Sequence, residues 1–127
     1  MTGENREANA RDELARAATC LREARALPYG AASRAYYAAF HAARALLFSV
    51  GLDVGSHRGV VNLLGEHFVR PGRLSPEMAR LLSRMHADRH DADYAAQAVF
   101  TTDESAEAIA DAERFLEAVE GLLPPRR

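Results

Sequence analysis

The chain has 127 residues and a formal net charge of −2, with 48% apolar and 27% charged residues. This length predicts one domain with a core of its own, and the composition excludes a disordered chain. The charge excludes the overall basic excess typical of nucleic-acid-binding domains, so any such contact would depend on a local patch. The 16 basic residues other than histidine are all arginine, which favours bidentate phosphate contacts.

The first residues and the apolar runs bear on where the protein resides. The segment MTGENREANARDEL lacks the apolar stretch of a signal peptide. No apolar run approaches the roughly 20 residues that cross a membrane. The single cysteine, Cys20, excludes a disulfide framework. We therefore expect a cytoplasmic protein with no membrane contact.

Apolar residues recur at helical spacing along most of the chain, separated by turn residues. We expect a flexible N-terminus over residues 1–10, one helical domain over residues 11–122 and a C-terminal tail over residues 123–127. No segment alternates like a strand, so the fold class is all-α, a bundle of four to five helices. The predicted helices cover residues 11–26, 30–50, 57–69, a stretch from 76 into the segment 84–94, and about 102–122.

Local signals mark several helix ends. Gly51 follows the helix over residues 30–50 and is expected to end it. Ser75 precedes Pro76 and an acidic residue, which predicts a helix with Ser75 as its N-cap. Thr101 and Glu104 have the spacing of a second capping box.

The most apolar helix, over residues 30–50, carries its polar side chains on one side. At 100° per residue, five of them fall within about a quarter of the circumference. A hydroxyphenyl group, an imidazole and two guanidinium groups are among them, and these groups hold phosphates or bases. We call this set the polar face, and we expect it to bind nucleotide or RNA. Its members are Ser33, Arg34, Tyr37, His41 and Arg44.

We expect other residues of the same helix to have structural roles. Tyr36 and Phe40 lie in a separate apolar sector. Small side chains form a further stripe, which lets two helix backbones approach closely and raises the hypothesis of a purely structural helical dimer. The stripe consists of Ala35, Ala38, Ala42 and Ala45.

A second polar cluster, RMHADRHDADY, covers residues 84–94. On a continuous helix, His86, Arg89, His90, Asp93 and Tyr94 share one broad face. A solvated, salt-bridged surface is the alternative interpretation, with Arg89 and Asp93 as a weak pair. The tyrosine favours a functional role, because a tyrosine among charges is often anchored through its hydroxyl.

Metal and hydrolase chemistry have weaker support in the sequence. His86 and His90 have the spacing to share a metal ion, with Asp93 or His41 as further ligands. The segment HADRH lacks the glutamate of the HExxH metalloprotease signature, which excludes that class. Neither a nucleophile elbow nor a phosphate-binding GK[ST] loop is present. We expect no metal and no other cofactor, and surface positions for His57 and His67.

Acid–base chemistry without a metal fits the residue types better. RNA cleavage needs a base for the 2′-hydroxyl, an acid for the 5′-oxygen and a cation near the phosphorus. Histidine and arginine serve these roles near neutral pH. Both polar clusters contain both residue types, so the chemistry is feasible.

The chain also resembles a known family. The block SRAYYAAFHAARALL is followed by a short linker with SH, then FV-x-P-G-x-L, RHDADY and a last helix with AERFLEAV. Together, from about Leu14 to Leu122, these features resemble the HEPN superfamily, in particular the prokaryotic branch encoded beside minimal nucleotidyltransferases. The resemblance implies an up-and-down bundle and a homodimer.

The resemblance also implies a site. In active HEPN ribonucleases, an arginine followed four to six residues later by a histidine forms a composite site at the dimer interface. Arg84 and His90 satisfy this spacing. In this branch the matching element is usually Arg-x-x-Ala-Asp-Tyr, which places Arg89, Asp93 and Tyr94 on the motif and Asp93 in place of the histidine. Tyr94 then corresponds to the tyrosine that can accept a nucleotide from the partner.

Two functions follow as hypotheses. The first is a HEPN toxin-like, metal-independent endoribonuclease of a toxin–antitoxin pair with a nucleotidyltransferase partner. The second is a non-catalytic nucleotide- or RNA-binding module that acts as a nucleotidyltransferase partner. The candidate catalytic residues are Arg84, Arg89, His90 and Asp93. The candidate nucleotide- or RNA-binding residues are Arg34, Tyr37, His41, Arg44, His86 and Tyr94.

Overall fold

The computed structural model describes residues 3–26, 31–94 and 102–124, without the side chains of residues 4, 88–94, 102 and 103. These ranges contain helices and connecting turns but no strand, which confirms the all-α class. The helices are α1 (Gly3–Ala26), α2 (Ala31–Ser49), α3 (His57–Leu64), the π-helical turn η1 (Gly65–Val69), α4 (Pro76–Tyr94) and α5 (Thr102–Leu122).

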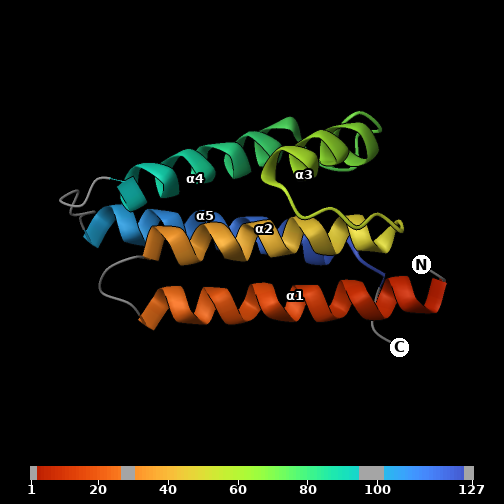
Figure 1. The fold of residues 1–127 in the computed structure, drawn as a ribbon, viewed down its shortest axis with the longest axis horizontal. Helices are drawn as coiled ribbons and strands as arrows, with labels where there is room; N and C mark the ends of the chain where they lie inside the picture. The colour runs from red at the N-terminus through yellow and green to blue at the C-terminus, as the bar shows by residue number, and fades with distance from the viewer. Residues whose placement is uncertain (1–2, 27–30, 95–101, 125–127) are drawn as a thin grey trace.

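The four long helices run up and down alongside one another (Figure 1). α2 lies between α1 and α4, with α5 behind it in this view, and it contacts all three. The short α3 lies next to α4 and follows the loop that leaves α2. α2 is therefore the central helix, and each of its sides meets a different neighbour.

Small side chains allow α2 to occupy this central place. Ala35, Ala38, Ala42 and Ala45 are all fully buried within the single chain. Alanine lets neighbouring helix backbones approach closely, and here the neighbours belong to the same chain. The stripe therefore offers no surface to a second copy, and its interpretation as the seam of a dimer is wrong. Larger fully buried side chains complete the core: Leu46, Leu47, Leu64, Phe68, Leu82, Phe115 and Val119.

The structure places the start of α1 earlier than the sequence pattern does. Residues 3–10, expected to be flexible, are helical. Ala10 is buried, and the Arg6 side chain lies so close to Gly51 that a Cβ there would be 2.8 Å from Arg6 Nε. The first turns of α1 thus pack over the end of α2. The pattern missed them because residues 3–9 lack regularly spaced apolar side chains.

The end of α2 is the one predicted. Gly51 has a φ of 84°, a left-handed conformation that favours glycine. Its N–H donates to Phe48 O at 2.9 Å, and the N–H of Leu52 donates to Leu47 O at 2.9 Å. This pair of hydrogen bonds is the Schellman motif, which satisfies the last carbonyls of a helix. The loop to α3 starts from this fixed end.

Two serine N-caps begin the next helices. Ser75 Oγ accepts a hydrogen bond from Met78 N at 3.2 Å, which confirms the predicted cap of α4. Ser56 Oγ accepts one from Gly59 N at 3.0 Å and caps α3. The stretch predicted as one helix over residues 57–69 is α3 followed by the wider turn η1. The predicted cap Thr101 lies outside the described residues.

Candidate functional site

The polar face of α2 looks largely toward α1 rather than toward α4. Arg34 Nε lies 3.4 Å from Glu23 Oε2 of α1, and both side chains are about half exposed. His41 and Arg44 both contact Glu13 of α1. Opposite charges on α1 therefore hold three of the candidate binding residues, and nothing in the pattern of α2 alone reveals these partners.

Glu13 is the centre of this ion network. Its side chain is only 2% exposed, and Oε2 lies 3.2 Å from His41 Nδ1 and 2.9 Å from Arg44 Nη1. Arg16 Nη1 approaches the other oxygen at 3.4 Å. Burial by itself raises the pKa of Glu13, but the hydrogen bond from His41 and the charges of Arg44, His41 and Arg16 outweigh it, so the pKa lies below its ordinary value. Glu13 is thus held as a carboxylate.

Arg44 ties three elements together through all of its nitrogens. Besides the contact with Glu13, Nε donates to Val54 O at 3.1 Å and Nη2 donates to Asp53 Oδ1 at 3.2 Å. The guanidinium carbon also lies 5.1 Å from the centre of the Phe48 ring. Arg44, a candidate binding residue, therefore anchors α2 to α1 and to the loop after α2.

A cluster of rings joins α2, α3 and α4. The imidazoles of His57 and His86 are stacked, with ring centres 3.8 Å apart and planes inclined by 14°. Tyr36 Oη lies 2.9 Å from His57 Nδ1, and its ring centre is 5.3 Å from that of His86. The Tyr37 ring is 5.5 Å from the Tyr36 ring. Through these contacts the polar segment of α4 reaches α2 next to the polar face.

His57 corrects one expectation from the sequence. His67 is exposed, as expected, whereas His57 is half-buried and bonded as described above. Desolvation, and secondarily the charge of His86, lower the pKa of His57 below its ordinary value. A half-buried imidazole that stays neutral at physiological pH can accept or relay a proton.

This lowered pKa predicts a pH-dependent stability. The unfolded chain binds a proton at His57 near the ordinary value of 6.5, and the folded protein does so only at lower pH. Acidification below about 6.5 therefore lowers the free energy of unfolding. We expect His57→Phe, which keeps an aromatic ring on His86, to remove this part of the pH dependence.

Urea denaturation at about pH 7.5 and about pH 5.5 measures the effect. His67→Phe, at the exposed histidine of η1, is the control and should keep the wild-type difference between the two pH values. A difference that is unchanged in His57→Phe would contradict the assignment.

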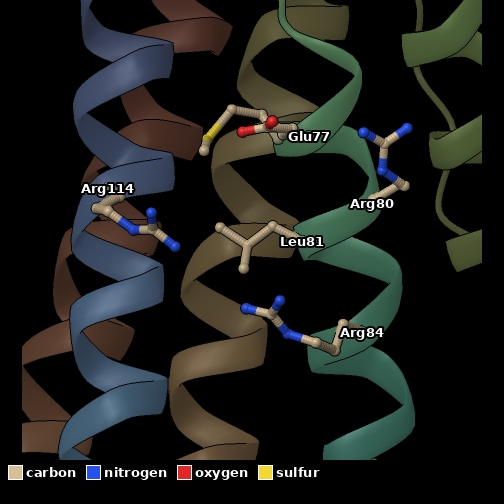
Figure 2. Close-up of a pocket in the computed structure, with 6 residues that line it drawn as sticks. Glu77, Arg80, Leu81, Arg84 and Arg114 are labelled. Atoms are coloured by element: carbon tan, nitrogen blue, oxygen red, sulfur yellow. The ribbon is translucent and has the colours of Figure 1, made fainter.

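Arg84 lies on another side of α4 from His86. Its Nη2 is 2.9 Å from Asp111 Oδ2 of α5, and Arg114 Nη2 is 2.8 Å from Asp111 Oδ1. In Figure 2 the guanidinium groups of Arg84 and Arg114 are directed into the space between α4 and α5, with Leu81 between them. An open pocket of about 200 Å³ lies here. In this structure Arg84 therefore ties α4 to α5.

The other candidates on α4 belong to its last turns. The helix continues to Tyr94, as the shared face over residues 86–94 requires. At 100° per residue, positions 89, 90 and 93 fall within about 60° of position 86, and position 84 falls about 160° away. The side chains of Arg89, His90, Asp93 and Tyr94 lie outside the described residues. Position 94 falls about 80° from position 86, so helical register groups these four positions with His86 and separates them from Arg84.

The described residues show neither a metal-binding cluster nor a membrane-spanning helix. Among these residues, no group of three or more His, Cys, Asp and Glu side chains is arranged to hold a metal ion. Of the pair considered for a metal, His86 is described, whereas the side chain of His90 lies outside the described residues. None of the described helices is both long enough and apolar enough to cross a membrane.

Three histidine side chains lie around α2. His41 lies on the side of α1, and His57 and His86 lie on the side of α3 and α4. Tyr36 and His41 are five residues apart on α2, a rise of about 7.5 Å. At 100° per residue these two positions are about 140° apart around α2, so His41 and the ring cluster on Tyr36 lie on different sides of the helix.

Comparisons with known proteins identify the family of this chain. The HEPN domain model matches residues 6–122. A UPF0332 protein of Thermotoga maritima is 34% identical over 113 residues, covering 85% of this chain and 86% of the relative. The protein named "Putative toxin MJ0605" of Methanocaldococcus jannaschii is 36% identical over 94 residues, covering 73% and 69%. With this match over nearly its whole length, the chain belongs to the HEPN family.

Proposed function

We propose that this protein is a toxin-like ribonuclease that cleaves RNA by acid–base chemistry of its own side chains. Two relatives from Methanocaldococcus jannaschii are named "Putative toxin MJ0605" and "Putative toxin MJ0142". The observation that carries the proposal is the stacked pair His57 and His86 against Tyr36, directly before the polar last turns of α4. A half-buried imidazole pair of this kind suits proton transfer near neutral pH.

Each residue of the proposed site has its own role in RNA cleavage. A base takes the proton of a ribose 2′-hydroxyl, whose oxygen attacks the adjacent phosphorus, and an acid protonates the departing 5′-oxygen. His90 and His86 are assigned to proton transfer, and Arg89 to the charge that develops on the phosphate. Asp93 is assigned a positioning role, in which it hydrogen-bonds another group of the site. It is not assigned to proton transfer, because an ordinary carboxylate is a weak acid–base group at pH 7.

Alanine variants of the last turns of α4 test this assignment. We expect purified His90→Ala and Arg89→Ala to degrade a labelled single-stranded RNA at least about 100-fold more slowly than the wild type. The matched control is Arg80→Ala, an exposed arginine two to three turns earlier on α4, which should keep wild-type activity. Equal activity of all three variants would contradict this site, and intact RNA with the wild type would contradict the ribonuclease.

The proposed assembly follows the same family resemblance. We propose a homodimer in the cytoplasm, with a minimal nucleotidyltransferase as antitoxin partner and Tyr94 as the residue that accepts a nucleotide from it. Sedimentation analysis of the purified chain tests the dimer. Mass spectrometry after incubation with the enzyme of a neighbouring gene and ATP tests Tyr94, with Tyr94→Phe as the control.

A second function is favoured by one residue. Asp93 occupies the motif position where a histidine is expected, so the site can have lost cleavage and kept binding. In that case the protein is a non-catalytic nucleotide- or RNA-binding partner of a nucleotidyltransferase. Calorimetry then shows binding of nucleotide or partner without cleavage of RNA, whereas failure to bind either contradicts this alternative.

A further inference from the structure

The contact between α1 and α2 contains a carboxylate–imidazole pair that lies away from the α4 motif. Glu13 Oε2 lies 3.2 Å from His41 Nδ1. Glu13 is almost fully buried, whereas about a quarter of the His41 side chain is exposed. In the described part of the chain, no group bonds the second ring nitrogen of His41, Nε2. The buried end of the imidazole is therefore fixed, and the other nitrogen is available.

The chemistry of this contact sets the tautomer of His41. An ionised carboxylate only accepts hydrogen bonds, so the nitrogen facing Glu13 must carry the proton. Glu13 stays ionised, because Arg44, His41 and Arg16 lower its pKa. In neutral His41, Nδ1 is then the donor and Nε2 has a free lone pair. A third group that orients a base in this way is a recurring arrangement in proton-transfer sites.

We infer that Glu13 is a positioning residue for His41, whose Nε2 accepts the proton of a ribose 2′-hydroxyl bound at the polar face of α2. This inference rests on the proposed ribonuclease function and names His41 as the base of that reaction, so that only the acid role is left to the histidines of α4. The 2′-oxygen bonds to the neighbouring phosphorus as the bond from phosphorus to the 5′-oxygen breaks. The proton passes to Nε2, and the 5′-oxygen receives one from a second acid or from water. His41 then returns its proton to solvent.

The surroundings hold the pair in place. Arg44 Nη1 contacts the same Glu13 oxygen at 2.9 Å and is itself anchored to Asp53 and Val54. The carboxylate therefore cannot rotate away from His41 without breaking a second ion pair. Tyr37 precedes His41 by one turn on the same side of α2, where its ring can lie against a base.

Nuclear magnetic resonance tests the positioning without any need for activity. Long-range ¹H–¹⁵N correlation of the full-length protein reports the tautomer of each imidazole, and His41→Gln identifies the His41 signals. We expect the Nδ1–H tautomer in the wild type and in the control Glu23→Leu, which replaces an exposed acid on the same helix. Glu13→Leu, which keeps the burial but offers no hydrogen-bond acceptor, should shift His41 toward the Nε2–H form. An Nε2–H tautomer in the wild type would overturn the inference.

Chemical rescue tests the proton transfer. We expect His41→Ala to cleave RNA at least about 10-fold more slowly, with added imidazole restoring part of the rate. A loss that imidazole does not reverse, in a variant with wild-type circular dichroism, would reject His41 as the base. If the wild type leaves RNA intact while His41 shows the Nδ1–H tautomer, the ribonuclease proposal and the base fail and the positioning by Glu13 stands.

Discussion

Replacing Glu13 with alanine is expected to lower the free energy of unfolding by about 3 kcal/mol, the lower end of the range for removing one partner of a buried ion pair. The change removes the acceptor shared by His41 and Arg44, which are both mostly buried. The charge of Arg44 and the N–H groups of both side chains then face an interface that no longer satisfies them. Urea denaturation of wild type and variant measures the difference.

The matched control for this prediction is Glu23→Ala. Glu23 lies on the same helix and pairs with Arg34, but both side chains are about half exposed. Exposed ion pairs contribute less than about 1 kcal/mol, so this variant should stay close to the wild type. Equal losses in the two variants would contradict the structural role of Glu13.

The contact of Glu13 with His41 and Arg44 also predicts that the protein loses stability at acid pH. Because the folded protein holds the pKa of Glu13 below 4.5, the contribution of Glu13 is fully present above that ordinary value. It is lost as the pH falls from 4.5 through the lower folded value. Glu13→Ala lacks this contribution, so its free energy of unfolding should change less with pH in that range, which urea denaturation measures.

Replacing His86 with alanine is expected to slow RNA cleavage by at least about 100-fold, the range for loss of a general acid or base. His86 stacks on His57 and lies on the side of α4 that carries positions 89, 90 and 93. His86→Phe separates chemistry from packing, because it keeps a ring on His57 but cannot transfer a proton. We expect both variants to lose activity and His86→Phe to keep wild-type stability.

His67→Ala provides the control for this second prediction. His67 is exposed on η1 and should be dispensable for cleavage. Wild-type activity in His86→Phe would assign His86 a packing role only.

Local patterns in the sequence predicted most of the fold. The Ser75 cap and the Gly51 helix end depend on residues close together in the chain, and both are confirmed, as are the helices apart from the earlier start of α1 and the π-helical turn η1. The alanine stripe was recognised as a close-packing surface, but the sequence did not reveal that its partners are in the same chain. Whether a buried stripe meets another helix of the chain or a second copy depends on tertiary packing.

The contacts of the candidate site were much harder to predict. Glu13 and His41 are 28 residues apart, and only folding brings them together. One signal was present, because Glu13 interrupts a stripe on α1 in which Ala10, Ala17 and Ala24 are buried. An acid among buried alanines needs a partner across the interface. His57 follows an N-cap serine, and nothing near it in the sequence reveals its stack with His86.

The chemical nature of the RNA ends tests the central claim, a ribonuclease that works through its imidazoles, most directly. A single-stranded RNA is incubated with the wild-type protein and with His90→Ala, and the new ends are identified by mass spectrometry. Attack by the 2′-oxygen predicts 2′,3′-cyclic phosphate and 5′-hydroxyl ends with the wild type and their loss in the variant. RNA that stays intact with folded wild-type protein, or new ends with 5′-phosphate and 3′-hydroxyl groups, would contradict the claim.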